Sequence, residues 1–207
     1  AGIDYGGGKG VINLKGVEKT KDLLKSFGEL VQFLDGSYIA GKDVGINIHD
    51  LRTMAQTSEY VAHVNPDIHS VDPSPPTALG IIRGMEASIN TLREGMAPGR
   101  NLEGLHIVIQ GLGAVGYRVA SMLKKKKAQL TVTDTNKEVL EKAVAKFGAK
   151  AIKQPNKIYD VECDIFAPCA LGSIINEDTI ERFKCKIICG SANNQLEDKL
   201  AGYAMLV

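Results

Sequence analysis

The chain has 207 residues, of which 44% are hydrophobic and 24% are charged, and its formal net charge is +1 at pH 7. These proportions are ordinary for a water-soluble globular protein, and the near-neutral charge argues against nucleic acid as a main partner. The sequence contains neither a membrane-length apolar run nor a signal-peptide pattern at its start. We therefore expect a cytoplasmic protein without a membrane partner.

The cysteines show no metal-binding spacing. None of them forms a C-x-x-C pair, and three lie in or beside segments that have the composition of core strands. We therefore expect buried free thiols and no metal site. The cysteines are Cys163, Cys169, Cys185 and Cys189.

A glycine-rich segment near the start surrounds one lysine. The run Gly6-Gly7-Gly8 precedes Lys9 and leaves backbone amides that a ligand can approach closely. A lysine in a closed, desolvated cleft can lose its proton near neutral pH and act as a base. The phosphate-loop motif is excluded, because it would require glycine in place of Ile3 and serine or threonine in place of Gly10. The alternative is a flexible turn with an exposed lysine.

The next residues predict two helices and a short strand. Residues 20–34 have an amphipathic helical pattern, whose apolar side includes Leu30 and Leu34. Residues 37–40 predict a strand, and a second helix is expected near residues 48–57 with the preceding asparagine as its cap.

Asp43 lies between these elements, with a glycine two residues away on either side. Carboxylates at strand ends are well placed for a cleft, and the glycines permit close approach of a ligand. Asp43 would then form an acid/base couple with Lys9. The alternative is a turn aspartate that binds its own backbone.

A proline-rich stretch at residues 63–76 separates the two parts of the chain. We place a domain boundary there and expect domains of residues 1–72 and 73–207. A helix is predicted from Thr77 to about Arg93, with a serine cap and proline in its first turn. We expect this helix to cross from the first domain to the second.

From residue 105 onward, strands and helices alternate. Alternating units of this size imply a parallel sheet with right-handed crossovers, in a Rossmann-type doubly wound α/β fold. Gly148 is expected to end the second helix of the series. The expected strands lie near residues 105–110, 128–133, 150–152, 163–167 and 186–189, and the expected helices near residues 114–125, 136–147 and 176–183.

The first strand of this series ends at Gln110 and runs into the motif Gly111-Leu112-Gly113-Ala114-Val115-Gly116. Gly111 would permit a tight turn, Gly113 would let a pyrophosphate approach the backbone, and Gly116 would let the helix pack on the strand. The free amides and positive dipole end of the helix would hold the phosphates. We predict a dinucleotide site from this order of elements. The alternative is a plain tight turn.

The second strand ends at Asp134, 23 residues after Gly111. A carboxylate at this point can accept hydrogen bonds from a ribose 2′-hydroxyl and would repel a 2′-phosphate, so the sequence favours NAD over NADP. The alternative is that Asp134 serves only as a helix cap. The pattern from Thr135 to Glu138 does resemble a capping box.

Several motifs, in the right order and over essentially the whole chain, resemble the amino acid dehydrogenases. This family includes the glutamate, leucine, phenylalanine and valine enzymes. Residues 6–12 (GGGKGVI) and 38–45 (YIAGKDVG) resemble the family as a whole. The segments that resemble its leucine/phenylalanine branch are residues 72–80 (DPSPPTALG), 83–85 (RGM), 161–172 (VECDIFAPCALG) and 190–196 (GSANNQL).

The resemblance implies reversible, NAD-dependent oxidative deamination of an L-amino acid to a 2-oxo acid and ammonia. It also implies a homo-oligomer and a cleft that closes between two domains. Lys9 matches the lysine that activates the attacking water, with its pKa lowered by its setting, and Asp43 matches the carboxylate that shuttles protons to and from the substrate nitrogen. Residues expected at the nicotinamide and ribose are Thr77, Cys169, Ala170, Ala192, Asn193 and Asn194, and those expected at the substrate pocket are Gly7, Gly8 and Gly41.

Substrate choice depends on few residues. At the position of Gly41, relatives that prefer leucine tend to carry alanine, and relatives that prefer phenylalanine tend to carry glycine. This change alters the discrimination between substrates by only ~1–3 kcal/mol. We expect leucine or valine as substrate, with a phenylalanine-type dehydrogenase or a non-catalytic NAD-binding module as alternatives.

The resemblance also implies that both domains are partial. It places a substrate-binding lysine ahead of Ala1 and further pocket segments after Val207. The 207-residue chain alone is therefore expected to turn over poorly, because it lacks the group that anchors the substrate.

Overall fold

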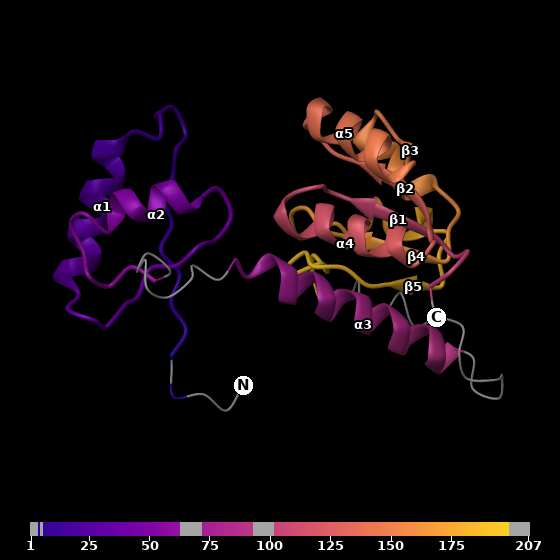
Figure 1. Ribbon diagram of the computed structural model, residues 1–207, viewed down its shortest axis with the longest axis horizontal. Coiled ribbons are helices and arrows are strands. Elements are labelled where there is room, and N and C mark those ends of the chain that lie inside the picture. The colour runs from indigo at the N-terminus through magenta and orange to yellow at the C-terminus, as the bar shows by residue number, and fades with distance from the viewer. Residues whose placement is uncertain (1–3, 5, 63–71, 93–101, 199–207) are drawn as a thin grey trace. The chain divides into compact units, whose positions relative to one another are not determined.

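A computed structural model describes residues 4, 6–62, 72–92 and 102–198. The chain divides into two compact units, Ala1–Asp72 and Pro73–Val207 (Figure 1). Most of the proline-rich stretch, residues 63–71, lies outside the described residues. Among the residues that are described, no helix has the length and apolar character needed to cross a membrane.

Two helices, α1 (Lys21–Phe33) and α2 (Ile48–Met54), form the core of the first unit. The prediction that Asn47 caps the second helix is confirmed, because its side chain accepts the N–H groups of the first turn of α2. The helices approach closely at Gly28, where a Cβ would lie 2.5 Å from the carbonyl oxygen of Met54. The buried side chains of this unit are Leu24, Val31, Ala40, Leu51, Met54 and Val61.

Two expectations for this unit are wrong. Leu30 and Leu34 are exposed, because the buried face of α1 is only a narrow stripe of one residue per turn through Leu24, Gly28 and Val31. The predicted strand at residues 37–40 is reduced to a single parallel bridge between Ala40 and Val61. Within the described ranges, no other residue of that segment pairs with a strand, so the segment is irregular there.

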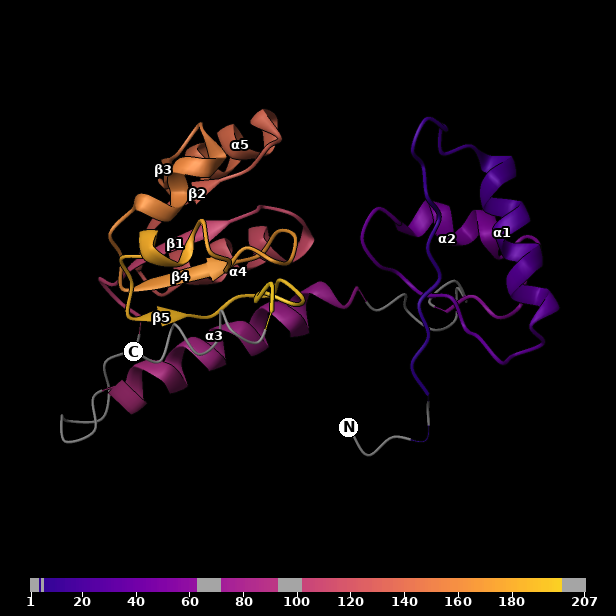
Figure 2. The same ribbon diagram turned by 180° about the vertical axis from the view of Figure 1, so that it is seen from behind.

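The second unit contains one parallel five-stranded sheet, whose strand order is β3-β2-β1-β4-β5 (Figure 2). This order is that of doubly wound dinucleotide-binding folds, and it confirms the predicted α/β class. The chain reverses its direction of winding at β1, so β1 and β4 are neighbours with a switch point at their carboxyl ends. The strands are β1 (His106–Gln110), β2 (Gln129–Thr133), β3 (Lys150–Ala151), β4 (Ile165–Pro168) and β5 (Ile187–Ile188).

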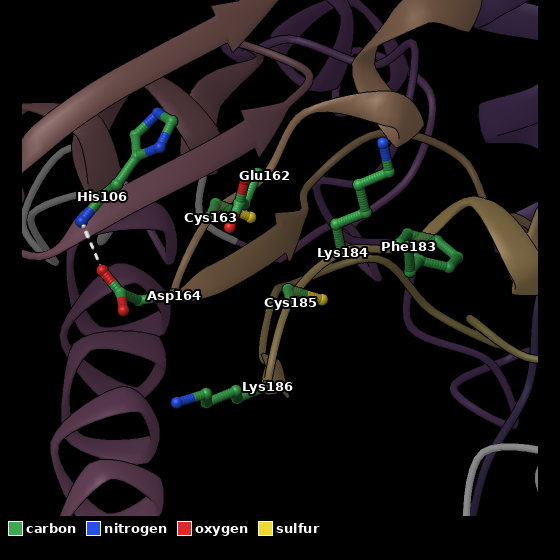
Figure 3. Close-up of a pocket in the computed structure, with 8 residues that line it drawn as sticks. All are labelled: His106, Glu162, Cys163, Asp164, Phe183, Lys184, Cys185 and Lys186. Carbon is green, nitrogen blue, oxygen red and sulfur yellow. Dashed lines mark hydrogen bonds between the residues drawn. The ribbon is translucent and has the colours of Figure 1, made fainter.

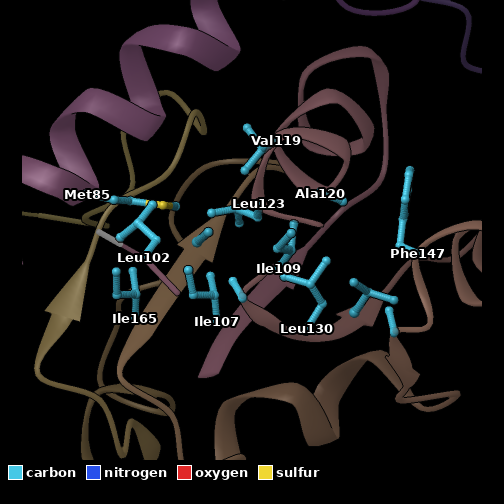
Figure 4. Packing of buried hydrophobic residues seen from close by; sticks show 14 of the residues in the cluster. Met85, Leu102, Ile107, Ile109, Val119, Ala120, Leu123, Leu130, Phe147 and Ile165 are labelled. Carbon is cyan, nitrogen blue, oxygen red and sulfur yellow. The ribbon is translucent and has the colours of Figure 1, made fainter. Parts of the chain in front are cut away.

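Three helices, α3 (Ser74–Leu92), α4 (Ala114–Lys125) and α5 (Lys137–Phe147), pack on one face of the sheet. The opposite face is covered by the short 3₁₀ helix η1 (Pro155–Asp160) and by the segment after β4. Close packing of apolar side chains stabilises the layer between helices and sheet. Figure 4 labels members of this layer: Met85, Leu102, Ile107, Ile109, Val119, Ala120, Leu123, Leu130, Phe147 and Ile165.

Two further expectations differ from the structure. The helix α3 lies wholly in the second unit and packs on α4, so it does not cross between domains, and Arg93 lies outside the described residues. The helix predicted at residues 176–183 is only a 3₁₀ turn, η2 (Ile180–Arg182). Asn176 Oδ1 accepts the N–H groups of Asp178 and Thr179, as an N-cap does, but the backbone becomes extended at Phe183 before an α-helix can form. The end of α5 at Gly148, with φ of 66°, is confirmed.

Candidate functional site

The glycine turn connects the end of β1 to the start of α4. Gly111 has a φ of 94°, and a Cβ there would lie 2.8 Å from the Cβ of Ala170. At Gly116 a Cβ would lie 2.0 Å from the carbonyl oxygen of Gly111, so α4 packs directly on the turn. Gly113 caps α4 without a side-chain hydrogen bond, and the space within 4 Å of a Cβ there is empty. Packing thus requires glycine at Gly111 and Gly116, whereas Gly113 leaves room for an anion beside the N-terminal amides of α4.

Asp134 is held against this turn from the end of β2. Its Oδ2 accepts the N–H of Leu112 at 2.6 Å, and its Oδ1 accepts the N–H of Asn136 at 2.7 Å. The capping-box alternative is wrong, because α5 is capped by Asn136, whose side chain accepts the N–H groups of Glu138 and Val139. Asp134 is therefore a carboxylate fixed beside the glycine turn.

The loops after β4 and β5 reach the same edge of the sheet. The N–H of Cys169 donates to the carbonyl oxygen of Gln110 at 2.7 Å, and the N–H of Ala192 donates to that of Pro168 at 2.9 Å. The two loops also touch each other, since a Cβ at Gly172 would lie 2.4 Å from the carbonyl oxygen of Asn193. The structure thus gathers these predicted cofactor residues at the carboxyl edge: Cys169, Ala170, Ala192, Asn193 and Asn194.

Three of the predicted cofactor residues have side chains in contact with other groups of the protein. Gln110 Nε2 donates to the hydroxyl of Tyr159 at 2.7 Å, on the face opposite α4. The Cβ of Cys169 lies 3.0 Å from where a Cβ at Gly116 would be, and burial raises the pKa of its thiol. Thr77 donates its hydroxyl to the carbonyl oxygen four residues earlier at 2.8 Å. Sequence reasoning missed Tyr159, which belongs to no motif.

In the first unit, Lys9 and Asp43 meet although 34 positions separate them. The ammonium group of Lys9 donates to Oδ2 of Asp43, whose Oδ1 accepts the N–H of Val44 at 2.7 Å. The Lys9 side chain is 66% exposed and that of Asp43 46% exposed. An amine and a carboxylate thus lie within reach of direct proton transfer.

This pairing shifts both pKa values. The hydrogen bond and charge of Asp43 raise the pKa of Lys9, and the same hydrogen bond lowers the pKa of Asp43. The expectation of a lowered lysine pKa is therefore wrong for the described structure. Because Lys9 is exposed, desolvation is too weak to outweigh its anionic partner.

Tyr38 supports the glycine-rich segment. Its hydroxyl accepts the N–H of Gly10 at 3.0 Å, and its ring lies 3.2 Å from where a Cβ at Gly8 would be. By contrast, a Cβ at Gly7 or Gly41 would have nothing within 4 Å. The segment is thus anchored on one side and open on the other. Tyr38 had no role assigned from sequence, although it begins one of the recognised motifs.

Replacing Asp43 by asparagine should lower the pKa of Lys9, because it removes the carboxylate that raises it. At a fixed mildly alkaline pH, more of the Lys9 amine will be uncharged, and an amine-specific acylating reagent will modify it faster. Mass spectrometry of peptides measures this rate, with the exposed Lys15 of the same sample as internal control. An unchanged Lys9 rate relative to Lys15 would contradict the ion pair.

Comparison with known proteins places these features in a family. Residues 72–199 match the model of the glutamate/leucine/phenylalanine/valine dehydrogenase family. The chain is 45% identical to the leucine dehydrogenase of Thermoactinomyces intermedius, over 98% of this chain and 54% of that protein. It is 40% identical to the phenylalanine dehydrogenase of Bacillus thermotolerans, over 95% of this chain and 52% of that protein.

A solved structure is similar over both units. The crystal structure of L-tryptophan dehydrogenase from Nostoc punctiforme matches with a TM-score of 0.66 and 38% identity. The match covers 91% of this chain and 52% of that one. The chain thus spans about half the length of the curated relatives it matches.

Proposed function

The chain belongs to the glutamate/leucine/phenylalanine/valine dehydrogenase family, and we propose that its complete protein catalyses the NAD-dependent, reversible oxidative deamination of leucine or valine. The products are the 2-oxo acid and ammonia. The observation that carries the proposal is the Lys9–Asp43 pair in the first unit, in a chain whose second unit has a glycine turn with an adjacent carboxylate. The dinucleotide fold alone would not specify this chemistry, since it serves many reactions.

The residues at the carboxyl edge of the sheet fit a dinucleotide. The open space at Gly113 and the N-terminal amides of α4 suit a pyrophosphate, and Asp134 retains lone pairs for a ribose hydroxyl. Bound NAD would supply the acceptor for the hydride that leaves the substrate α-carbon. The proposed contacts of its ribose and nicotinamide are Thr77, Cys169, Ala170, Ala192, Asn193 and Asn194.

In the first unit, Asp43 would accept the proton of the substrate ammonium and return it to the departing amine. Lys9, once uncharged, would take a proton from the water that attacks the imino carbon. Its raised pKa opposes this role in the described state, so we propose that bound substrate excludes water from the pair and lowers that pKa. The open flanks at Gly7 and Gly41, with Gly8 between Gly7 and Lys9, would border the substrate.

Replacing Asp134 by asparagine is expected to shift cofactor preference toward NADP. Asparagine keeps an oxygen for the N–H of Leu112 and loses the acceptor for the N–H of Asn136. It also removes the charge that repels a 2′-phosphate, a repulsion of about 1.4 kcal/mol. The ratio of kcat/KM for NADP to that for NAD should rise about tenfold. Glu138→Gln is the matched control, because this exposed acid lies on α5. Equal ratios in both variants would remove Asp134 from the ribose site.

The substrate proposal is tested by kcat/KM for L-leucine, L-valine, L-phenylalanine and L-glutamate with the complete protein. We expect leucine or valine to be preferred. The open space at Gly41 favours a phenylalanine-type enzyme as the second candidate. A preference for glutamate would refute the proposed branch. A homo-oligomeric state and a cytoplasmic location are proposed on the family resemblance.

A further inference from the structure

A pocket at the amino ends of β1, β4 and β5 lies at the opposite edge of the sheet from the glycine turn (Figure 3). It is open to solvent, and two of the four cysteines line it. The proposed deamination uses neither of them. The lining residues are His106, Glu162, Cys163, Asp164, Phe183, Lys184, Cys185 and Lys186.

The backbone register places Cys163 directly opposite Cys185. Glu162 pairs with Lys184 in a parallel bridge, and Ile165 pairs with Ile187 in the same register. The N–H of Cys163 donates to the carbonyl oxygen of Lys184 at 3.1 Å. This hydrogen bond joins the two segments between the bridge and the β4–β5 pairing. Neighbouring strands lie about 4.8 Å apart, within the range of about 4.4–6.8 Å between Cα atoms that a disulfide spans.

The two thiols also share one side of the sheet. Both pack against the apolar cluster of Val108, Ile158 and Phe166, and each is half-buried at the pocket. Each thiol shifts the pKa of the other: Cys185 raises the pKa of Cys163, and Cys163 lowers that of Cys185. Within the intact pair, Cys185 is therefore the thiol that ionises first.

We propose that Cys163 and Cys185 form a thiol–disulfide exchange site for small-molecule disulfides, which closes to a reversible bond between the segments leading into β4 and β5. Register, shared packing and access from the pocket carry this assignment. The other two thiols lack such a partner arrangement within the described residues. Cys189 lies against the carbonyl oxygen of Ile81, and burial raises the pKa of both Cys169 and Cys189.

The exchange balances without any other reactant. The Cys185 thiolate attacks one sulfur of the small disulfide, whose S–S bond breaks and releases one thiolate. The thiol of Cys163 then gives up its proton to the released thiolate and attacks the Cys185 sulfur, which expels the second thiolate. The protein loses two electrons and two thiol protons, and the small disulfide becomes two thiols.

Oxidised glutathione added to the full, reduced chain tests the proposal. Peptide mapping should find one disulfide-linked pair that joins Cys163 to Cys185, with Cys169 and Cys189 still free, and dithiothreitol should reverse it. Cys189→Ser is the matched control and should form the same bond. Absence of the bond, or linkage of either sulfur to another cysteine, would overturn the proposal.

Two single variants test the pairing. Cys163→Ser should accumulate a glutathione adduct on Cys185, and Cys185→Ser one on Cys163, because in each variant the thiol that would complete the exchange is missing. Closure of a disulfide from the remaining thiol to Cys169 or Cys189 would contradict the assignment of Cys163 and Cys185 as partners. Circular dichroism of both variants establishes that each is folded.

Discussion

Replacing Lys9 by alanine in the complete protein is expected to lower kcat for deamination by about 10²–10⁴-fold, the usual contribution of a positioned acid or base. The Lys9 ammonium group forms an ion pair with the Asp43 carboxylate, and no other lysine in the described part of the chain is paired with this carboxylate. The affinity for NAD should stay unchanged, because the proposed nucleotide residues belong to the other unit. Steady-state kinetics and calorimetric titration with NAD measure the two quantities.

The exposed Lys15 provides the matched control for this substitution. Lys15→Ala removes an equal charge from the same unit and should leave kcat within about twofold, as expected for a surface substitution. If Lys9→Ala behaves like Lys15→Ala, the lysine has no part in the chemistry. A non-catalytic NAD-binding module would then be the better description.

Replacing Gly116 by alanine is expected to lower the free energy of unfolding of the second unit by about 3 kcal/mol. The new Cβ would lie 2.0 Å from the carbonyl oxygen of Gly111, which is a backbone atom and cannot turn away. Either α4 moves off the turn or the turn opens, and both changes disturb the sheet edge. Urea denaturation followed by circular dichroism measures the loss.

Gly113→Ala is the matched variant, because nothing lies within 4 Å of its new Cβ and its φ of −65° suits alanine. Its stability should stay within about 0.5 kcal/mol of the parent chain. Its affinity for NAD should fall at least about tenfold, since the methyl group occupies the space proposed for the pyrophosphate. Full affinity in Gly113→Ala would place the phosphates elsewhere.

Much of the second unit could be predicted from sequence, because its helices and strands have strong local signals. The apolar run that leads into the glycine turn predicts β1, a second β-rich run predicts β2, and Gly148 supplies the left-handed residue that ends α5. Two details of the second unit differ from the local patterns. Asn136 caps α5, and not the capping box from Thr135 to Glu138 that the sequence offered as an alternative. The helix predicted at residues 176–183 stops after one 3₁₀ turn, because the backbone becomes extended at Phe183 and Lys184 pairs with Glu162, a tertiary contact that no local pattern encodes.

The contact between Lys9 and Asp43 was predictable from sequence, but the electrostatics of the pair were not. Motifs identified Lys9 and Asp43, and the structure brings them into contact. The sign of the lysine pKa shift could not be read from sequence, because it depends on exposure of the pair. The support from Tyr38 and Tyr159 likewise depends on tertiary contacts that no local pattern encodes.

The most direct test is to incubate the complete protein with L-leucine and NAD and to quantify NADH and ammonia in the same reaction. Oxidative deamination predicts steady NADH formation with one ammonia released per NADH, and loss of both in the Lys9→Ala variant. NAD binding without NADH formation from leucine, valine or phenylalanine would contradict the proposed activity. NADH formation without equivalent ammonia would contradict the proposed reaction.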